Sequence, residues 1–302
     1  MTETQDARFR PEGQDDLAPS GSLARVRANL EAIRLVRALD EEKRPATRAE
    51  QQVLARWSGW GAVPAVFDER ETVDGRPGPG VRYEWAREEL RRLLSPDEYE
   101  SARANTVNAH FTDAGLVTAI WDGLGELGFA GGRVLEPGCG SGNFIGMAPP
   151  GTDMVGVELD PTTAAIASAL YPHATIRSES FAATRLSEGS FDAVIGNVPF
   201  GFIQLRDLRY NPGRRLPIHT HFVLKSLHLV APGGMVALIT SRFTMDGTTD
   251  AAVRARERMA AMADLVAVVR LPDTAHRRAA GTSVVTDLLI LRRREPDRAP
   301  DG

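Results

Sequence analysis

The sequence predicts an α/β protein, with a mostly parallel seven-stranded sheet, an antiparallel last strand and a helical extension in front. In the second half of the chain, short apolar runs alternate with amphipathic segments, as in strands joined by crossover helices. In the first half, apolar residues recur at helical spacing without a strand-like run. The 302 residues, of which 42% are hydrophobic, suffice for one large domain or for a domain with a sizeable extension.

Composition excludes several classes of protein. No apolar run approaches the length of about eighteen residues that a membrane span requires, and the polar N-terminus lacks a secretory apolar stretch. Cys139 is the one cysteine, which excludes internal disulfides and zinc sites built from several cysteines. The net charge of −4 argues against a strongly basic nucleic-acid-binding surface but leaves a local basic patch open. These observations predict a cytoplasmic protein.

The first half is predicted to contain a disordered arm and a helical region. Residues 1–20 are rich in Gly, Pro, Asp and Gln, which predicts disorder, and residues 21–108 form the helical region. A first helix is expected from Ser22 to about Leu39. A capping box at Thr47–Glu50 and a capped first-turn proline at Ser95–Glu98 predict two more helix starts, and residues 72–80 (TVDGRPGPG) predict a loop.

The second half, residues 109–295, is predicted to be the α/β domain, followed by a disordered tail over residues 296–302. The connection between the last two strands contains glycine and is too short for a confident crossover helix, so these strands are expected to be antiparallel neighbours. The expected strands are Arg133–Glu136, Met154–Glu158, Ala174–Arg177, Ala193–Gly196, Met235–Thr240, Leu265–Arg270 and Val285–Leu291. The expected helices are Asn143–Met147, Pro161–Tyr171, His219–Val230 and Asp250–Ala263.

A glycine-rich turn follows the first expected strand. In Glu136-Pro137-Gly138-Cys139-Gly140-Ser141-Gly142-Asn143, every second residue after the proline is glycine, which lets backbone amides approach a ligand closely. Dinucleotide and flavin sites share this pattern, and a tight turn without a ligand also fits it. Glu136 would repel a pyrophosphate but suits a cationic amino acid. Cys139 is interpreted as a small packing residue.

The next two strands end in polar groups. In Val155-Gly156-Val157-Glu158-Leu159-Asp160, the carboxylate of Glu158 can accept hydrogen bonds from both hydroxyls of a ribose, although a solvated strand end also fits. Asp160 precedes a proline and is expected to cap a helix. The later strand 191–197 ends in Asn197-Val198-Pro199-Phe200, an amide followed by a proline and an aromatic ring.

With these three motifs the chain resembles S-adenosylmethionine-dependent N-6 adenine DNA methyltransferases, whose hallmark is Asn/Asp-Pro-Pro-Tyr/Phe on the fourth strand. Val198 replaces the first proline of that motif. Asn108–Thr112 looks like the family segment that closes over the methionine moiety. Ser58-Gly59-Trp60-Gly61, Val66-Phe67-Asp68 and Phe243-Thr244-Met245-Asp246 are similar to the methylase regions of phage- and plasmid-borne methylase–helicase proteins. The resemblance covers about residues 22–293 and implies the three-layer class I (Rossmann-like) methyltransferase fold.

The resemblance implies a catalytic motif, Asn197-Val198-Pro199-Phe200, and a site for S-adenosylmethionine. The implied cofactor-binding residues are Phe111, Thr112, Glu136, Pro137, Gly138, Gly140, Gly142, Asn143, Glu158, Leu159, Phe181 and Asn197. Phe181 would flank the adenine ring of the cofactor. Glu179-Ser180-Phe181 stands where the family often shows Asp-Phe, so an adenine contact is not carried over to Glu179.

The implied substrate is the N-6 amine of adenine in DNA, with a helicase or a specificity subunit as a partner and with no metal and no membrane. Phe200, Arg206, Arg209, Tyr210, Arg214 and Arg215 are the expected substrate-binding residues: the arginines would pair with phosphates and Tyr210 would stack on a base. An ordinary solvated loop fits the segment 202–217 equally well. A protein glutamine amide or an RNA base as acceptor, and a non-catalytic nucleic-acid-binding partner that retains the fold, stay open as alternatives.

Overall fold

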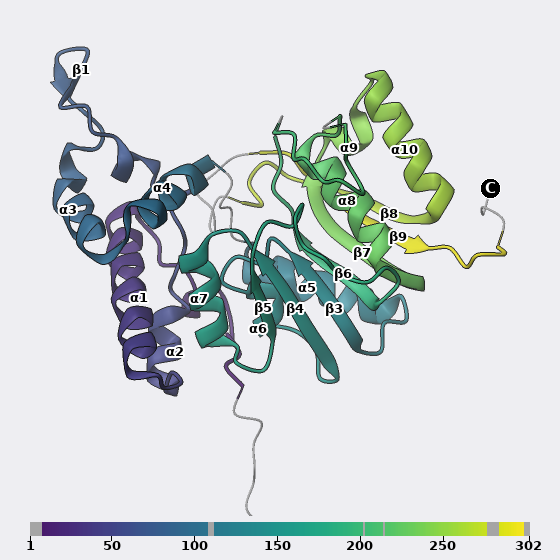
Figure 1. Cartoon of the computed structure of the whole chain (residues 1–302), viewed down its shortest axis with the longest axis horizontal. Helices are drawn as coiled ribbons and strands as arrows, with labels where there is room; N and C mark the ends of the chain where they lie inside the picture. The colour runs from purple at the N-terminus through teal and green to yellow at the C-terminus, as the bar shows by residue number, and fades with distance from the viewer. Residues whose placement is uncertain (1–7, 108–111, 202, 214, 277–283, 299–302) are drawn as a thin grey trace, which may run out of the picture.

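The computed structural model describes residues 8–107, 112–201, 203–213, 215–276 and 284–298. A seven-stranded sheet occupies the centre of the molecule, and helices cover it; the helical N-terminal region lies at one end (Figure 1). Within the described ranges, no helix is long and apolar enough to cross a membrane.

The sheet has the strand order β5-β4-β3-β6-β7-β9-β8. Strands β3 to β7 pair in parallel, whereas β9 is antiparallel to both of its neighbours, β7 and β8. The predicted mostly parallel sheet with an antiparallel last strand is therefore confirmed, and so is the antiparallel pairing of the last two strands. The strands are β3 (Gly132–Pro137), β4 (Thr152–Glu158), β5 (Thr175–Ser178), β6 (Phe191–Asn197), β7 (Val230–Ser241), β8 (Ala263–Leu271) and β9 (Thr286–Arg293).

Alternation along the strands divides the core into two layers. Val134 and Ile195 face a layer that includes the helices α5 (Ala114–Glu126), α6 (Asn143–Gly146) and α7 (Pro161–Leu170). Leu135 and Val194, one residue removed from them, face the layer of α8 (Ile218–Leu229) and α10 (Asp250–Met262). Successive strand residues point to opposite faces, so apolar residues at consecutive positions bury both faces. A short helix, α9 (Phe243–Asp246), follows β7.

The described part of the N-terminal region contains four α-helices, and it packs on α7 through α1 and α2. Two of its helices begin at the predicted caps, because Thr47 and Ser95 each accept a hydrogen bond from the backbone N–H of a glutamate three residues later. The helices are α1 (Ser22–Glu42), α2 (Arg48–Leu54), α3 (Glu84–Leu93) and α4 (Pro96–Ala104).

The expected loop at residues 72–80 contains a small β-hairpin, so the prediction of an N-terminal region without a sheet is wrong. Strands β1 (Thr72–Val73) and β2 (Arg76–Pro77) pair antiparallel across Asp74 and Gly75. Both turn residues have positive φ, 50° and 73°, as the tightest hairpin turns require. The Asp-Gly pair signalled this turn, but the prolines and glycines around it favoured an irregular loop.

The N-terminal arm is packed over residues 8–20, so the prediction of disorder is wrong for that part; residues 1–7 and most of the predicted tail, 299–302, lie outside the described residues. Phe9 and Leu17 are each 3% exposed. The backbone N–H of Ala114, at the start of α5, donates to the side-chain oxygen of Gln14 at 3.0 Å. The composition of the arm is polar, but its few apolar side chains are buried and Gln14 satisfies a helix end.

Candidate cofactor and substrate site

A pocket lies at the carboxyl ends of β3, β4 and β6, where the strand order changes direction between β3 and β6. Open α/β sheets bind ligands at such a point, because the connections leave in opposite directions and open a crevice. Of the residues that the resemblance implied for the cofactor, nine line this pocket: Thr112, Glu136, Gly138, Gly140, Asn143, Glu158, Leu159, Phe181 and Asn197. Asn197 and Pro199 of the catalytic motif line the same pocket.

The glycine turn after β3 depends on its glycines. Gly138, Gly140 and Gly142 have φ of 72°, 55° and 88°, a region that side chains with a Cβ rarely adopt. A Cβ at Gly142 would also lie 2.8 Å from a ring carbon of Tyr171. The backbone N–H groups of Gly138 and Cys139 donate to the carbonyl of Val157, which fixes the turn to β4. Cys139 is buried in this turn as a packing residue.

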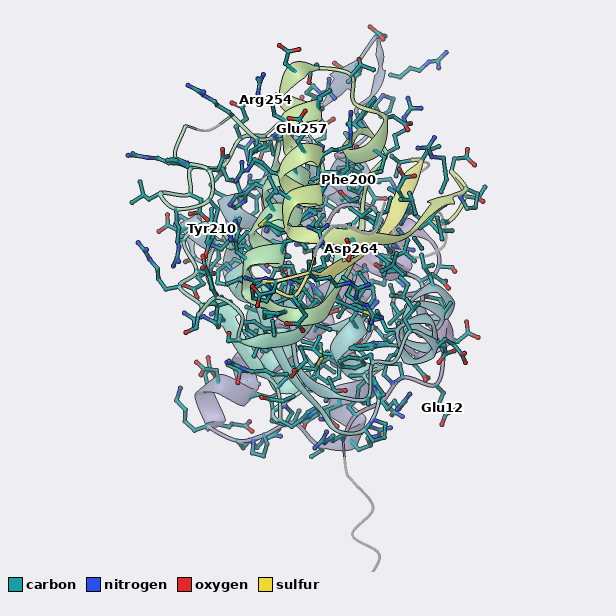
Figure 2. The ribbon with its side chains drawn as sticks, turned by 90° about the vertical axis from the view of Figure 1, so that its right-hand side faces the viewer. Glu12, Phe200, Tyr210, Arg254, Glu257 and Asp264 are labelled. Atoms are coloured by element: carbon teal, nitrogen blue, oxygen red, sulfur yellow. The ribbon has the colours of Figure 1, made fainter. Side chains whose placement is uncertain are left out.

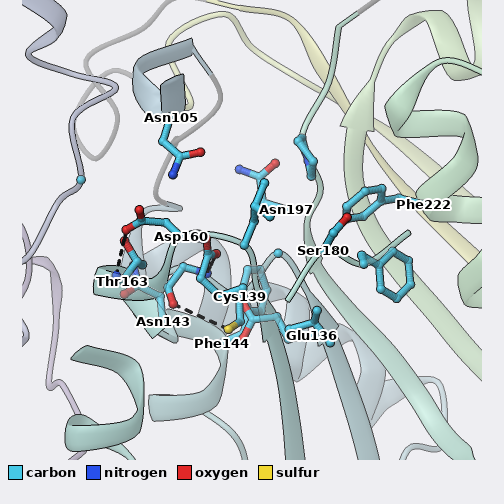
Figure 3. A pocket seen from close by; sticks show the side chains of 18 of the residues that line it. Asn105, Glu136, Cys139, Asn143, Phe144, Asp160, Thr163, Ser180, Asn197 and Phe222 are labelled. Atoms are coloured by element: carbon cyan, nitrogen blue, oxygen red, sulfur yellow. Dashed lines mark hydrogen bonds between the residues drawn. The ribbon is translucent and has the colours of Figure 1, made fainter. Parts of the chain in front are cut away.

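Glu158 forms the wall of the pocket at the end of β4. Its two carboxylate oxygens accept hydrogen bonds from the backbone N–H groups of Gly140, at 2.9 Å, and Asp160, at 2.8 Å. Burial raises the pKa of Glu158 to about 7, because the charged form loses hydration. Leu159 beside it is 61% exposed, an apolar face at the pocket. Asp160 accepts from the backbone N–H of Thr163 and caps α7, as expected (Figure 3).

Glu136 lies at the floor of the pocket and is 3% exposed. Among the described residues, its Oε2 has no hydrogen-bond partner. Burial raises the pKa of Glu136 well above its ordinary value, and the nearby carboxylate of Glu158 raises it further. A buried acid with an unsatisfied oxygen is stabilised by a cationic donor, so the pocket favours a positively charged group at this place.

Asn197 ends β6 and is joined to the segment before α5. Its Nδ2 donates to Oγ1 of Thr112 at 3.2 Å, and Nδ2 of Asn143 donates to the carbonyl of the same threonine at 3.0 Å. Thr112 therefore connects the glycine turn with the catalytic motif. The two strand ends are close, since a Cβ on Gly138 would lie 3.6 Å from Cδ of Pro199.

Other residues of the predicted site stand outside the pocket lining. Val198 is buried, and its backbone N–H donates to the carbonyl of Ile239 on β7 at 3.0 Å. Phe200 is half-buried beyond the end of β6 (Figure 2). Pro137 and Gly142 shape the turn without lining the pocket. Phe111 lies outside the described residues, with Asn108, Ala109 and His110.

The rings of Phe181, which follows β5 in sequence, and of Phe222 on α8 form one side of the pocket. Phe181 is 3% exposed and its ring centroid lies 4.7 Å from that of Phe222 on α8. Glu179 and Ser180 also line this side, and Figure 3 shows Ser180 and Phe222 together there. Neither Ser180 nor Phe222 was predicted for the site. The helical spacing of Phe222 predicts only that it is buried, so no signal in the sequence separates it from core residues.

The arginine loop, defined as residues 203–217, follows the catalytic motif. Arg206, Arg209 and Arg215 are exposed, and Arg214 lies outside the described residues. The guanidinium of Arg209 pairs with the carboxylate of Glu188 at 2.8 Å. Arg206, Arg209 and Arg215 are thus accessible to a polyanion, and their contact with phosphates stays a prediction.

Tyr210 does not have the predicted role. It is 8% exposed, its hydroxyl donates to Glu188 at 2.9 Å, and its ring lies against the ammonium of Lys225. The guanidinium of Arg209, the ammonium of Lys225 and the ring of His228 lie around its ring, so the ring is not available for stacking on a base in this conformation. Sequence reasoning failed here because an aromatic residue between arginines looks the same whether the loop is extended or folded onto α8.

A buried ion pair anchors the arginine loop. Nζ of Lys225 donates to Asp207 at 3.0 Å and to the carbonyl of Phe181, and Nε2 of His221 lies 3.0 Å from the same carboxylate. Asn211 bonds Leu205 and Leu216 at the two ends of the loop. The loop is therefore held to α8 and to the wall of the pocket.

Within the described ranges, no group of His, Cys, Asp and Glu could hold a metal ion.

The N-terminal region contributes part of the pocket, which sequence reasoning missed. Trp57, Gly59, Trp60 and Asn105 line it. Figure 3 shows the amide groups of Asn105 and Asn197 facing each other across the space. The Ser58-Gly59-Trp60-Gly61 motif was the available signal, but helical periodicity elsewhere in the region indicated only an apolar face.

The sequence comparisons agree with this geometry. Residues 157–275 match the family described as Eco57I restriction-modification methylase. The chain is 28% identical over 215 residues to "Defense against restriction protein B" of Escherichia phage P1, covering 70% of this chain and 9% of the phage protein. It is 28% identical over 187 residues to "Type II methyltransferase M.XamI" of Xanthomonas campestris pv. amaranthicola, covering 54% of this chain and 34% of that protein. The chain thus spans about a tenth of the length of the phage protein and about a third of the length of the type II methyltransferase.

Solved structures show the same fold. A Listeria monocytogenes protein assigned to the class I S-adenosylmethionine-dependent methyltransferases matches with a TM-score of 0.52 and 15% identity, covering 91% of this chain and 90% of that chain. The methyltransferase subunit of a type I restriction-modification system from Streptococcus thermophilus matches with a TM-score of 0.53 and 14% identity, covering 89% and 66%. In sequence the chain is thus similar to restriction-modification methylases, and its fold is that of the class I S-adenosylmethionine-dependent methyltransferases.

Proposed function

We propose that the chain is a DNA methyltransferase that transfers the methyl group of S-adenosylmethionine to the N-6 amine of adenine. The observation that carries the proposal is the joint position of Asn197 and Pro199 with the glycine turn and Glu158 around one pocket. The match to restriction-modification methylases supports DNA as the substrate. The Asn197-Val198-Pro199-Phe200 sequence supports an amine of a base as the acceptor.

The pocket fits the cofactor. When bound, S-adenosylmethionine supplies a methyl group on a positively charged sulfur. Glu136, with its unsatisfied buried oxygen, suits the ammonium group of the cofactor. Glu158 would accept from the ribose hydroxyls, and Leu159 and Phe181 offer apolar faces for the adenine ring. The glycine turn lets the backbone approach without a Cβ in the way.

Asn197 would prepare the amine for transfer. The exocyclic amine of adenine is a poor nucleophile, because its lone pair is delocalised into the ring. If the side-chain oxygen of Asn197 and the carbonyl of Val198 accept the two amine hydrogens, the nitrogen becomes more tetrahedral and its lone pair localises. Thr112 holds the nitrogen end of the Asn197 amide, and Ile239 holds the backbone of Val198, so both acceptors are positioned beforehand. No strong base is required, since the amine becomes acidic after methylation.

Phe200 and the arginine loop would hold the substrate. An adenine can reach the pocket only after it leaves the stack of the duplex. Phe200, half-buried at the end of the catalytic motif, offers a face on which the extruded base stacks. The exposed Arg206, Arg209 and Arg215 would contact the phosphates that flank this base.

The test is single-turnover methylation of an adenine-containing oligonucleotide, with N-6-methyladenine quantified by mass spectrometry. Asn197→Ala removes one acceptor, and we expect turnover to fall by two to three decades, on the order of 3–4 kcal/mol, while cofactor binding is retained. Asn197→Asp keeps an acceptor oxygen and is the matched control, with a smaller loss. Wild-type rates in Asn197→Ala would overturn the mechanism. Radiolabelled cofactor offered with DNA, RNA or protein distinguishes the proposed substrate from an RNA base or a glutamine amide.

A further inference from the structure

Two tryptophans in the wall of the pocket carry indole N–H groups that have no acceptor among the described residues. Trp57 and Trp60 line the pocket and are each 2% exposed. The Nε1 atoms of both are buried and find no hydrogen-bond partner within the part of the chain that the structure describes. A buried donor without an acceptor costs about 1–3 kcal/mol, so folded proteins rarely keep two side by side.

The segment that carries these tryptophans is held in place by α1. Asn29 is fully buried; its Oδ1 accepts from the backbone N–H of Ser58 at 2.9 Å, and its Nδ2 donates to the carbonyl of Gly59 at 2.6 Å. The two indole rings meet edge to face, with centroids 5.9 Å apart. The turn is fixed from within the protein, so the orientation of the indoles is built in before any ligand arrives.

Several other donors of the pocket already have acceptors inside the protein. The N–H groups of Gly138 and Cys139 donate to Val157, that of Gly140 donates to Glu158, and Nδ2 of Asn143 donates to Thr112. None of the described residues that line the pocket is a lysine, an arginine or a histidine, whereas four are acids: Glu136, Glu158, Asp160 and Glu179. The pocket is therefore well suited to cations, and its recognition of an anionic group depends on neutral donors.

We propose that Trp57 and Trp60 bind the carboxylate of the methionine moiety of S-adenosylmethionine through their indole N–H groups. The inference rests on the proposed function and adds the N-terminal region to the cofactor site. Two donors match the two oxygens of a carboxylate, and hydrogen bonds to a charged acceptor are the stronger ones. Glu136 suits the ammonium of the same moiety. The acid would thus bind the positive end of the zwitterion, and the indole N–H groups would bind its negative end.

The test compares ligands with and without the carboxylate. Trp57→Phe/Trp60→Phe keeps two aromatic rings and removes both N–H groups. By calorimetry, S-adenosylhomocysteine should bind this double variant about tenfold or more weakly than it binds the wild-type chain. Decarboxylated S-adenosylmethionine and 5′-methylthioadenosine lack the carboxylate. The affinity of each of these ligands for the double variant should lie within about twofold of its affinity for the wild-type chain.

The matched control is Trp121→Phe. Trp121 is also a buried tryptophan, but its Nε1 donates to the carbonyl of Phe144 at 3.1 Å and it does not line the pocket. We expect it to leave the discrimination between the ligands unchanged. An equal loss for all three ligands in the double variant, or no loss for any, would overturn the role of the indoles. If S-adenosylhomocysteine fails to bind the wild-type chain, both proposals fall; if it binds but DNA is not methylated, only the proposed function falls.

Discussion

At the scale of single residues, the carboxyl group of Glu158 makes cofactor binding depend on pH. Burial raises its pKa to about 7, so about half of the free protein carries a proton there at neutral pH. A ligand whose ribose hydroxyls donate to this carboxylate favours the ionised form, and binding then releases this proton. Affinity for S-adenosylhomocysteine should therefore rise about tenfold from pH 6 to pH 8 and level off above. Calorimetry at several pH values measures this profile.

Glu158→Gln provides the comparison for that profile. The amide keeps the size of the side chain and an acceptor oxygen, but it does not titrate between pH 6 and pH 8. Binding to this variant should be weaker at pH 8 and nearly independent of pH. If the affinity of the variant depends on pH as steeply as that of the wild-type chain, the proton belongs to another group. The candidate is then Glu136, the neighbouring acid whose pKa is also raised.

The sequence predicted the conformation of individual residues well where a single physical requirement determines which residue type can stand at a position. Gly138 and Gly140 were predicted from a backbone requirement, and both have positive φ. Val198 shows the limit of such reasoning. The proposed mechanism uses only its carbonyl, yet its N–H donates to the carbonyl of Ile239 on β7, a bond that the proline of the commoner motif cannot make. Contacts of this kind depend on strand register, which a motif does not contain.

At the scale of elements, the arginine loop is the part of the molecule that we expect to track the DNA backbone. Arg206→Ala/Arg209→Ala/Arg215→Ala removes three exposed charges and should reduce DNA affinity and flatten its salt dependence by up to about three units of slope. Cofactor binding should not change. The loop keeps its anchor in the variant, because Asp207 and Lys225 are untouched. The measurement is a binding titration at several salt concentrations.

A second triple variant, Arg76→Ala/Arg82→Ala/Arg92→Ala, removes the same charge from exposed positions of the N-terminal region. It controls for net charge alone. Equal salt slopes for the two triple variants would show that the loop has no special contact with phosphates.

Elements were predictable where local signals agree with one another. The capped helices α2 and α4 begin where Thr47 and Ser95 predict, and each strand of the large sheet matches an apolar run to within a few residues. The hairpin β1–β2 was missed because its strands are two residues long and carry no alternation. The fold of the arginine loop depends on the partner of Asp207, eighteen residues away in sequence at Lys225, and no local pattern indicates such a pairing.

At the scale of the whole molecule, residues 8–20 join the N-terminal region to the α/β domain. Phe9 and Leu17 belong to the same core cluster as the helices of both. Phe9→Ala and Leu17→Ala should each lower the free energy of unfolding by about 2–5 kcal/mol, through lost burial and the cavity left behind. Leu23→Ala, at a position that is 38% exposed, should cost much less. Urea unfolding followed by circular dichroism measures all three, and equal small losses would show that the segment is only loosely attached.

The arrangement of the N-terminal region over the pocket is the feature that the sequence predicted least. Periodicity in α1 shows which face is apolar, but not that this face meets α7 of the other half. Trp57 and Trp60 looked like core residues of a helical region, and they are also part of the pocket wall. Their second role is set by the packing of segments that lie about a hundred residues apart.

The order of strands in the sheet has a consequence for synthesis of the chain. β9 is the last strand in sequence, yet it lies between β7 and β8 and is the one partner of β8 among the described strands. The ribosome makes the chain from its N-terminus. Until residue 293 has left the ribosome, one edge of β7 therefore stays unpaired and β8 cannot join the sheet. Before that moment the apolar side chains Leu265, Val266, Val268 and Val269 belong to an unpaired strand. Premature termination within β9 would leave β7 as an unpaired edge strand and β8 outside the sheet.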